Sequence, residues 1–198
     1  MKNIIIFASG SGSNAETIIN HFKNSNFAKV SAVFTNKINA GVIDRAKNHE
    51  IPFEVFSKDD FQDEKFLDTL NKYNPDLIVL AGFLLKVPEY LVKSFPNKII
   101  NIHPALLPNY GGKGMYGMNV HKAVFENKEK FSGMTIHYVN EHYDEGNIIF
   151  QDNINIEDCQ TPEEVALKVL SLEHKNYPVV VEEEIVRLLK SEAVSPKF

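Results

Sequence analysis

The sequence predicts a single α/β domain built on a mostly parallel, helix-covered β-sheet. Short apolar runs alternate with segments of helical periodicity, which is typical of β-α-β units. Two of these runs, residues 4–8 and 76–81, are almost wholly apolar, as expected for strands that are buried on both faces. The chain has 198 residues, of which 43% are hydrophobic. That is enough for one sizeable core and about the size of one domain.

The first half of the chain is expected to alternate strands and helices. Residues 4–8 form the first strand and stop at a glycine-rich turn, after which Ala15, Ile18 and Phe22 recur at helical spacing. Further strands are expected at 29–35, 52–56 and 76–81, and further helices at 41–50 and 63–73. Alternation of this kind predicts parallel pairing with helices packed on the sheet.

The next segment predicts a short helix at 88–95 and then a buried strand at 98–102. This strand would deliver Asn101 and His103 to its carboxyl end, where ligands of parallel sheets generally bind. Residues 104–119 contain four glycines and no apolar periodicity. A loop of this length inside a compact domain is more often functional than incidental.

The last third is expected to hold a helix at 120–126, strands at 133–139 and 148–151, and a final helix. That helix begins at a capping box formed by Thr161 and Glu164, with Pro162 at its first position, and its pattern continues to about Leu189. We therefore expect one domain over residues 1–190 and a frayed tail over residues 191–198.

Composition excludes several classes of protein. Twenty-one Lys and Arg against 26 Asp and Glu give a net charge of −5, so no overall basic field attracts nucleic acid or an anionic membrane. The single Cys159 cannot form an internal disulfide, which fits a reducing compartment. The N-terminal apolar run is too short to cross a membrane and lacks the usual cleavage site of a signal peptide. We expect a soluble, cytoplasmic protein, and the oligomeric state is not indicated.

The turn after the first strand reads Gly10-Ser11-Gly12-Ser13-Asn14-Ala15. Its glycines allow backbone N–H groups to approach an anion at the positive end of a helix, which suits a terminal phosphate. The same spacing matches a dinucleotide fingerprint, so an NAD site is an alternative. Against NAD, the second strand ends Phe34-Thr35-Asn36-Lys37, without the expected ribose-binding acid. A merely tight turn is the third interpretation, but it gives no use for Ser11, Ser13 and Asn14.

Asn101 and His103 lie two residues apart, so strand alternation aims both side chains to one side. An amide and an imidazole pointed at one carbonyl would stabilise an oxyanion, with protonated His103 as general acid. An ordinary hydrogen-bonded histidine is the alternative. Asp144 lies in a turn, Tyr143-Asp144-Glu145-Gly146, where a carboxylate usually bonds nearby backbone. If it reaches His103, it should raise the pKa of His103 and keep the imidazole protonated near neutral pH.

His121, His137 and His142 raise the question of a metal site. They form neither the i, i+4 helical pair of a metalloprotease nor a pattern with cysteine. We therefore expect no metal.

Five stretches of the chain, in this order and spacing, carry a family resemblance. They are Gly10 to Asn14, Leu80-Ala81-Gly82-Phe83, the Asn-Ile-His-Pro-Ala-Leu-Leu-Pro string at 101–108, Tyr143 to Gly146, and Glu173-His174. Together they resemble the glycinamide ribonucleotide formyltransferase family, the folate-dependent enzymes of purine synthesis. The similarity runs from Asn3 to about Leu189, and it implies a single formyltransferase domain with a Rossmann-like sheet.

The resemblance implies that the formyl group of 10-formyltetrahydrofolate, a co-substrate, is transferred to the amino group of 5-phosphoribosylglycinamide. The amine would attack directly, with no metal and no covalent intermediate. Family roles place Asn101, His103 and Asp144 in the catalytic group. Asn101 and Asp144 would also contact the folate.

The resemblance also implies where the two small-molecule substrates bind. Gly12, Ser13 and Asn14 would hold the substrate phosphate, and Glu173 would lie near its ribose or glycinamide end. The folate pterin would be bordered by Leu84, Leu85, Lys86 and Val87.

There are three alternatives to this identification. Methionyl-tRNA formyltransferase would need a C-terminal RNA-binding domain, and formyltetrahydrofolate hydrolase an extra N-terminal domain, and 198 residues leave room for neither. From a different class, a non-catalytic or NAD-binding Rossmann module is favoured only by the glycine spacing.

The glycine-rich segment 110–118 is either a lid over bound substrates or a passive insertion.

Overall fold

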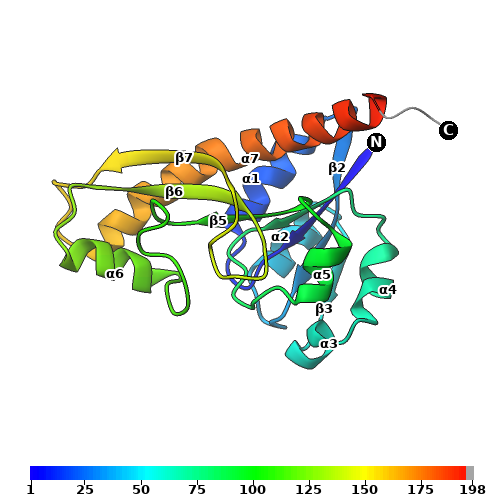
Figure 1. Ribbon diagram of the computed structural model, residues 1–198, viewed down its shortest axis with the longest axis horizontal. Helices are drawn as coiled ribbons and strands as arrows, with labels where there is room; N and C mark the ends of the chain where they lie inside the picture. Colours follow the sequence, from blue (N-terminus) through cyan, green and yellow to red (C-terminus); the bar gives the residue numbers. More distant parts are fainter. Residues whose placement is uncertain (195–198) are drawn as a thin grey trace.

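The computed structural model describes residues 1–194 and confirms the predicted fold class. Its single sheet has seven strands in the order β3-β2-β1-β4-β5-β6-β7 (Figure 1). The strands are β1 (Lys2–Phe7), β2 (Ala28–Thr35), β3 (Phe53–Val55), β4 (Leu77–Leu80), β5 (Ile99–His103), β6 (Phe131–Tyr138) and β7 (Ile148–Asn155). The first five pair in parallel, and β6 and β7 complete the sheet in antiparallel pairs.

Helices cover both faces of the sheet. Alternate residues of β1 divide between the two cores: Ile4 and Ile6 pack on one side, and Ile5 and Phe7 on the other. This alternation explains why the strand is apolar throughout. The first core is closed by α1 (Ser13–Phe22), α2 (Val42–Asn48), α6 (Met118–Glu126) and α7 (Pro162–Val194), and the second by α3 (Lys58–Gln62), α4 (Phe66–Asn71) and α5 (Glu89–Ser94).

The expected helix at 63–73 is too long at both ends, because α4 covers only Phe66–Asn71, and the short helix α3 that precedes it was not expected. A capping box begins α3: the Ser57 side chain accepts from the Asp60 N–H, and the Asp60 carboxylate accepts from the Ser57 N–H. The helix then ends at Gln62, and α4 begins at Phe66. The pattern of Ser57 and Asp60 is a local start signal that apolar periodicity does not contain.

The last helix, α7, runs along the whole length of the molecule (Figure 1). It continues through Pro178 to Val194, beyond the limit expected near Leu189. The buried Tyr177 hydroxyl donates to the Leu80 carbonyl over 2.9 Å, which fastens the helix to the sheet beside the proline. Residues 191–194 of the expected tail therefore belong to α7, and residues 195–198 lie outside the described part. Within residues 1–194, no helix combines the length and apolarity needed to cross a membrane.

Candidate active site

A cleft of about 710 Å³ opens at the carboxyl ends of β1, β4 and β5. The glycine-rich turn after β1, the segment after β4 and the end of β5 form its floor and sides. Loop residues 112–118, the turn that contains Asp144 and one side of α7 complete its walls. Stretches that are far apart in the sequence thus meet at the sheet edge where ligands of parallel α/β folds bind.

The turn between β1 and α1 borders the cleft. Gly12 has a φ of 74°, in the left-handed region, and a Cβ there would lie 2.5 Å from Cγ2 of Val42. The first hydrogen bond of α1 runs from the Glu16 N–H to the Gly12 carbonyl, so the amides before Glu16 have no helical partner. Ser13 and Asn14 line the cleft, whereas Gly12 is not among the lining residues. The turn is shaped for an anion by its backbone.

Asn14 and Glu173 form a buried pair beside this turn. The Asn14 Nδ2 donates to Glu173 Oε2 over 2.6 Å, and the two residues are 8% and 7% exposed. Burial raises the pKa of Glu173 to about 7, and the hydrogen bond from Asn14 opposes this effect only in part. The other amide atom, Asn14 Oδ1, is buried without a partner among the described residues. A hydrogen-bond donor on a ligand would satisfy it.

The segment Leu84–Val87 forms another wall, and all four of its residues line the cleft. Its start is fixed by the Ser9 hydroxyl, which accepts a hydrogen bond from the Leu84 N–H over 3.0 Å. The Lys86 ammonium lies 5.3 Å from the centroid of the Tyr143 ring. The segment is therefore in contact with the turn that carries Asp144.

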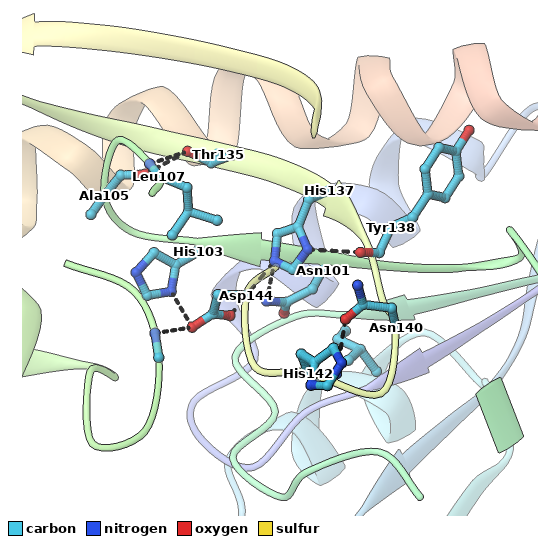
Figure 2. Close-up of polar contacts among 12 residues, drawn as sticks. Asn101, His103, Ala105, Leu107, Thr135, His137, Tyr138, Asn140, His142 and Asp144 are labelled. Atoms are coloured by element: carbon cyan, nitrogen blue, oxygen red, sulfur yellow. Dashed lines mark hydrogen bonds and ion pairs between the residues drawn. The ribbon is translucent and has the colours of Figure 1, made fainter. Parts of the chain in front are cut away.

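Asn101 and His103 point into the cleft from the end of β5, as strand alternation predicts. The His103 Nε2 lies 2.7 Å from the Tyr110 carbonyl, which assigns the proton of a neutral ring to Nε2. The Asn101 Nδ2 lies 3.1 Å from His137 Nε2. Figure 2 shows the Asn101, His103 and His137 side chains gathered around the Asp144 carboxylate.

Asp144 reaches both histidines from its turn. Its Oδ2 lies 3.6 Å from His103 Nδ1, and its Oδ1 lies 3.7 Å from His137 Nε2 (Figure 2). The Gly112 N–H donates to Oδ2 over 2.9 Å, so the loop after β5 also contacts this carboxylate. Asp144 itself has a φ of 56°. The carboxylate thus faces His103 and His137, and the predicted hydrogen bonds to the backbone of its own turn are not among its contacts.

The expectation that His103 is protonated near neutral pH is wrong for this structure. Burial lowers the pKa of His103 below its ordinary value, and it outweighs the raising effects of Asp144 and of the Tyr110 carbonyl. Burial raises the pKa of Asp144, but the neighbouring His137 ring, the hydrogen bond from the Gly112 N–H and the proximity of His103 bring it below its usual range. At pH 7 a neutral imidazole therefore faces an ionised carboxylate. His103 Nδ1 has an open lone pair, and a proton placed on it would be stabilised by Asp144.

His137 and the Tyr110 carbonyl contact the catalytic candidates but were not predicted to do so. The His137 Nδ1 donates to the Tyr138 carbonyl over 2.8 Å, so Nε2 of the neutral ring is the acceptor for Asn101. His137 reaches Asn101 because β6 runs antiparallel to β5 with these two residues opposite each other. That register follows from tertiary pairing, which the sequence pattern does not reveal.

The other two histidines considered for a metal, His121 and His142, also line the cleft. Residues 1–194 nevertheless contain no group of three or more His, Cys, Asp or Glu side chains placed to hold a metal ion.

Comparison with protein families and curated sequences identifies relatives of the whole described fold. The model of the formyl transferase family matches residues 2–181. The phosphoribosylglycinamide formyltransferase of Bacillus subtilis is 35% identical over 92% of this chain and 94% of that protein. The chloroplastic enzyme of the same name from Arabidopsis thaliana is 43% identical over 91% of this chain and 64% of its own length. The chain thus spans less than two thirds of this plant relative, and 60% of a second one from Vigna unguiculata.

Solved structures give the same result. Phosphoribosylglycinamide formyltransferase from Bacillus halodurans superposes with a TM-score of 0.84 at 33% identity, covering 99% of this chain and 100% of that one. The protein of the same name from Anaplasma phagocytophilum gives a TM-score of 0.83 at 33% identity, over 91% and 85% of the two chains. The likeness therefore extends over sequence and fold together.

Proposed function

The chain belongs to the formyl transferase family, and we propose that it transfers the formyl group of 10-formyltetrahydrofolate to the amino group of 5-phosphoribosylglycinamide. The relatives from Bacillus subtilis and Arabidopsis thaliana are named phosphoribosylglycinamide formyltransferases, and the proposed reaction is a step of purine biosynthesis. Both substrates are small molecules, and a cytoplasmic location is part of the same proposal.

One observation carries the proposal beyond the family name. A single cleft contains both an amide-lined turn suited to a phosphate and a His103, Asn101 and Asp144 group. A phosphorylated amine held at the turn would extend along the cleft toward His103. One substrate molecule could therefore reach both the anion-binding turn and the side chains proposed to take part in the reaction.

The proposed substrate placement follows the walls of the cleft. Backbone amides at Gly12, Ser13 and Asn14 hold the phosphate, and Glu173 with Asn14 contacts donors on the ribose or glycinamide part. Leu84, Leu85, Lys86 and Val87 border the pterin, whose formyl carbon then lies near the end of β5. The buried side chains of Val87 and Leu80 support an apolar wall for a flat ring.

The proposed reaction begins when the neutral amine attacks the formyl carbon. A C–N bond forms, and negative charge develops on the formyl oxygen, where the Asn101 amide stabilises it and His103 adds to this once it has accepted a proton. The attacking nitrogen then loses a proton, while the bond from the formyl carbon to the folate nitrogen breaks and that nitrogen gains a proton. Neutral His103 is suited to accept the proton, because Asp144 at 3.6 Å stabilises the resulting imidazolium.

The direct test is the formyl-transfer assay with both substrates, followed by the absorbance of the folate product. We expect product formation that requires the phosphoribosyl substrate. Absence of turnover with the full chain would refute the proposed activity.

A non-catalytic or NAD-binding module is the alternative that the glycine spacing leaves open. Asn36 and Lys37 at the end of β2 provide no acid for an adenosine ribose. Thermal shift separates the two functions: phosphoribosylglycinamide should raise the melting temperature and NAD should not. A shift with NAD alone would favour the module.

A further inference from the structure

The outer side of the glycine-rich turn is held by α2, on the side away from the cleft. The Val42 N–H donates to the Gly10 carbonyl over 3.2 Å, and the Arg45 Nε donates to the Ser11 carbonyl over 2.7 Å. A Cβ on Gly41 would lie 3.2 Å from the Ser11 Cα, so the start of α2 packs directly on the turn. Two successive carbonyls of the turn are thus fixed by one helix.

Because the peptide unit is planar, the direction of each carbonyl also fixes the direction of the N–H group of the next residue. In a trans peptide the C=O of one residue and the N–H of the next point in opposite directions. When the Ser11 carbonyl points to Arg45, the Gly12 N–H must point away from α2. Gly10, Ser11 and Ser13 line the cleft and no residue of α2 does, so we take the side away from α2 to be the cleft side. Arg45 therefore determines whether the Gly12 amide is available to a ligand.

Arg45 also pairs with an acid at the same end of α1. Its guanidinium forms an ion pair with Glu16, which lies in the first turn of that helix. An unpaired carboxylate there would oppose the binding of a phosphate. The buried, unpartnered Asn14 Oδ1 in the same helical turn is independent evidence that a ligand completes this corner of the cleft.

We propose that Arg45 is a positioning residue for the phosphate of the substrate: by holding the Ser11 carbonyl it turns the Gly12 N–H into the cleft. The inference rests on the proposed function. Arg45 does not line the cleft, so it acts on the phosphate through the turn and not by contact. By pairing with Glu16, Arg45 also reduces the repulsion between that carboxylate and the phosphate, which is a second and smaller contribution to phosphate binding.

The first test compares Arg45→Met with Lys47→Met, which removes the same charge from an exposed position of α2. Arg45→Met should raise the KM for the phosphoribosyl substrate about 10-fold, as loss of a charge-assisted hydrogen bond predicts. Its kcat should stay within about twofold and its folate KM should not change. Lys47→Met should leave all three constants unchanged. An unchanged KM in Arg45→Met, or equal rises in both KM values with a lower melting temperature, would overturn the proposal.

A second pair of variants separates the carbonyl contact from charge neutralisation. If Arg45 acts through Ser11, Arg45→Met should still raise the KM at least about fivefold when Glu16→Gln is already present. If Arg45 only neutralises Glu16, the effect should vanish in that background, and the proposal would be wrong.

A binding measurement keeps the test separate from the proposed activity. Titration of the full chain with inorganic phosphate should shift the Gly12 amide resonance in the wild type and in Lys47→Met. In Arg45→Met the shift should be much smaller at the same phosphate concentration. A wild-type chain that shows this shift but no formyl transfer would refute the proposed function and leave the role of Arg45 standing. Equal shifts in all three proteins would refute the role of Arg45.

Discussion

The two ends of the cleft are built in different ways. At the end proposed to bind the phosphate, here called the phosphate end, the polar groups are backbone amides of one short turn, which direct contacts with α2 fix. At the reacting end, they are side chains from β5, β6 and the turn at Asp144, and the distances from Asp144 to the two histidines are 3.6 and 3.7 Å. One end has its geometry set by local backbone, and the other has it set by the meeting of distant segments.

This difference shows how each end responds to change. Backbone amides carry no titratable group, so the phosphate turn should be sensitive to shape and insensitive to pH. The reacting end depends on where one proton lies between His103 and Asp144, and burial sets that balance. Substitutions that alter volume should therefore damage the first end, and those that alter charge should damage the second.

The largest effect should come from removing a charge or a proton acceptor at the reacting end. His103→Ala and Asp144→Asn should each lower kcat at least about 100-fold, as loss of an acid-base group or an oxyanion partner does. Asp144→Asn should also lower the pKa of His103 further, because it removes the neighbouring negative charge. Steady-state formyl transfer and an NMR titration of His103 measure the two effects. Near-wild-type turnover in either variant, or a His103 pKa that rises, would contradict these roles.

A change of shape at the phosphate end should act on binding. Gly12→Val should raise the KM for the phosphoribosyl substrate at least about 30-fold, because a Cβ would collide with Val42 and the φ of 74° disfavours a branched residue. Folate affinity should change far less, as calorimetry with each ligand would reveal. Adding Val42→Ala removes only the contact with Cγ2, because the Cβ and Cα of residue 42 would still lie 2.6 and 2.8 Å from the new Cβ, so it should restore little binding. Equal losses for both ligands would indicate general unfolding.

Glu173 is the exception at the phosphate end, since it is a buried titratable group. Its pKa is raised to about 7 from the usual value of 4.5. The free energy of unfolding is therefore highest below about pH 4.5 and falls as the pH rises through 7, because the buried carboxyl ionises less readily than the same group in the unfolded chain. Glu173→Gln removes this dependence and should be more stable than the wild type above pH 8, by up to roughly 3 kcal/mol. Urea unfolding at pH 5 and pH 8 measures the difference. The exposed Glu183→Gln on the same helix is the control, and a pH-independent difference for Glu173→Gln would exclude the charged-burial effect.

The smallest effect should come from the loop that joins the two ends. Gly112 and Gly114 both have a φ of 92°, so replacing residues Gly111, Gly112 and Gly114 with alanine strains the loop. If the loop is a lid, kcat should fall and KM should rise together, each about three- to tenfold. Amide exchange of residues 110–118 should slow when substrate binds. Unchanged kinetics without such protection would support a passive insertion. Gly111→Ala alone should be milder, because its φ is not in the left-handed region and its one contact under 3.0 Å would be with the end of the Leu107 side chain.

The sequence allowed the fold and the position of the glycine-rich turn to be predicted because both depend on local patterns. Apolar runs set the strands, and Gly10 to Asn14 set the turn that lies between β1 and α1. The helix α3 at 58–62 was missed because its start depends on the capping contacts of Ser57, and not on apolar periodicity.

The reacting end could be predicted only in part. Asn101 and His103 follow from strand alternation, but the neutral state of His103 does not, since burial of the ring is a property of the assembled fold. The contact between His137 and Asn101 depends on the register of β6 against β5. The role of the Tyr110 carbonyl depends on the path of an irregular loop. None of these three features leaves a periodic signal in the sequence.

The position of Glu173 on α7 has a consequence for biosynthesis of the protein. A ribosome releases the chain from its N-terminus, and α7 is the last of the described elements, so all seven strands leave the ribosome before Glu173 and Tyr177 do. Until then the glycine turn lacks its buried partner for Asn14, and the sheet lacks the helix that covers β4. We therefore expect the nascent chain to acquire substrate affinity late and abruptly. Ribosome-arrested chains that expose residues up to 160 should not retain phosphoribosylglycinamide, whereas chains that expose residues up to 194 should.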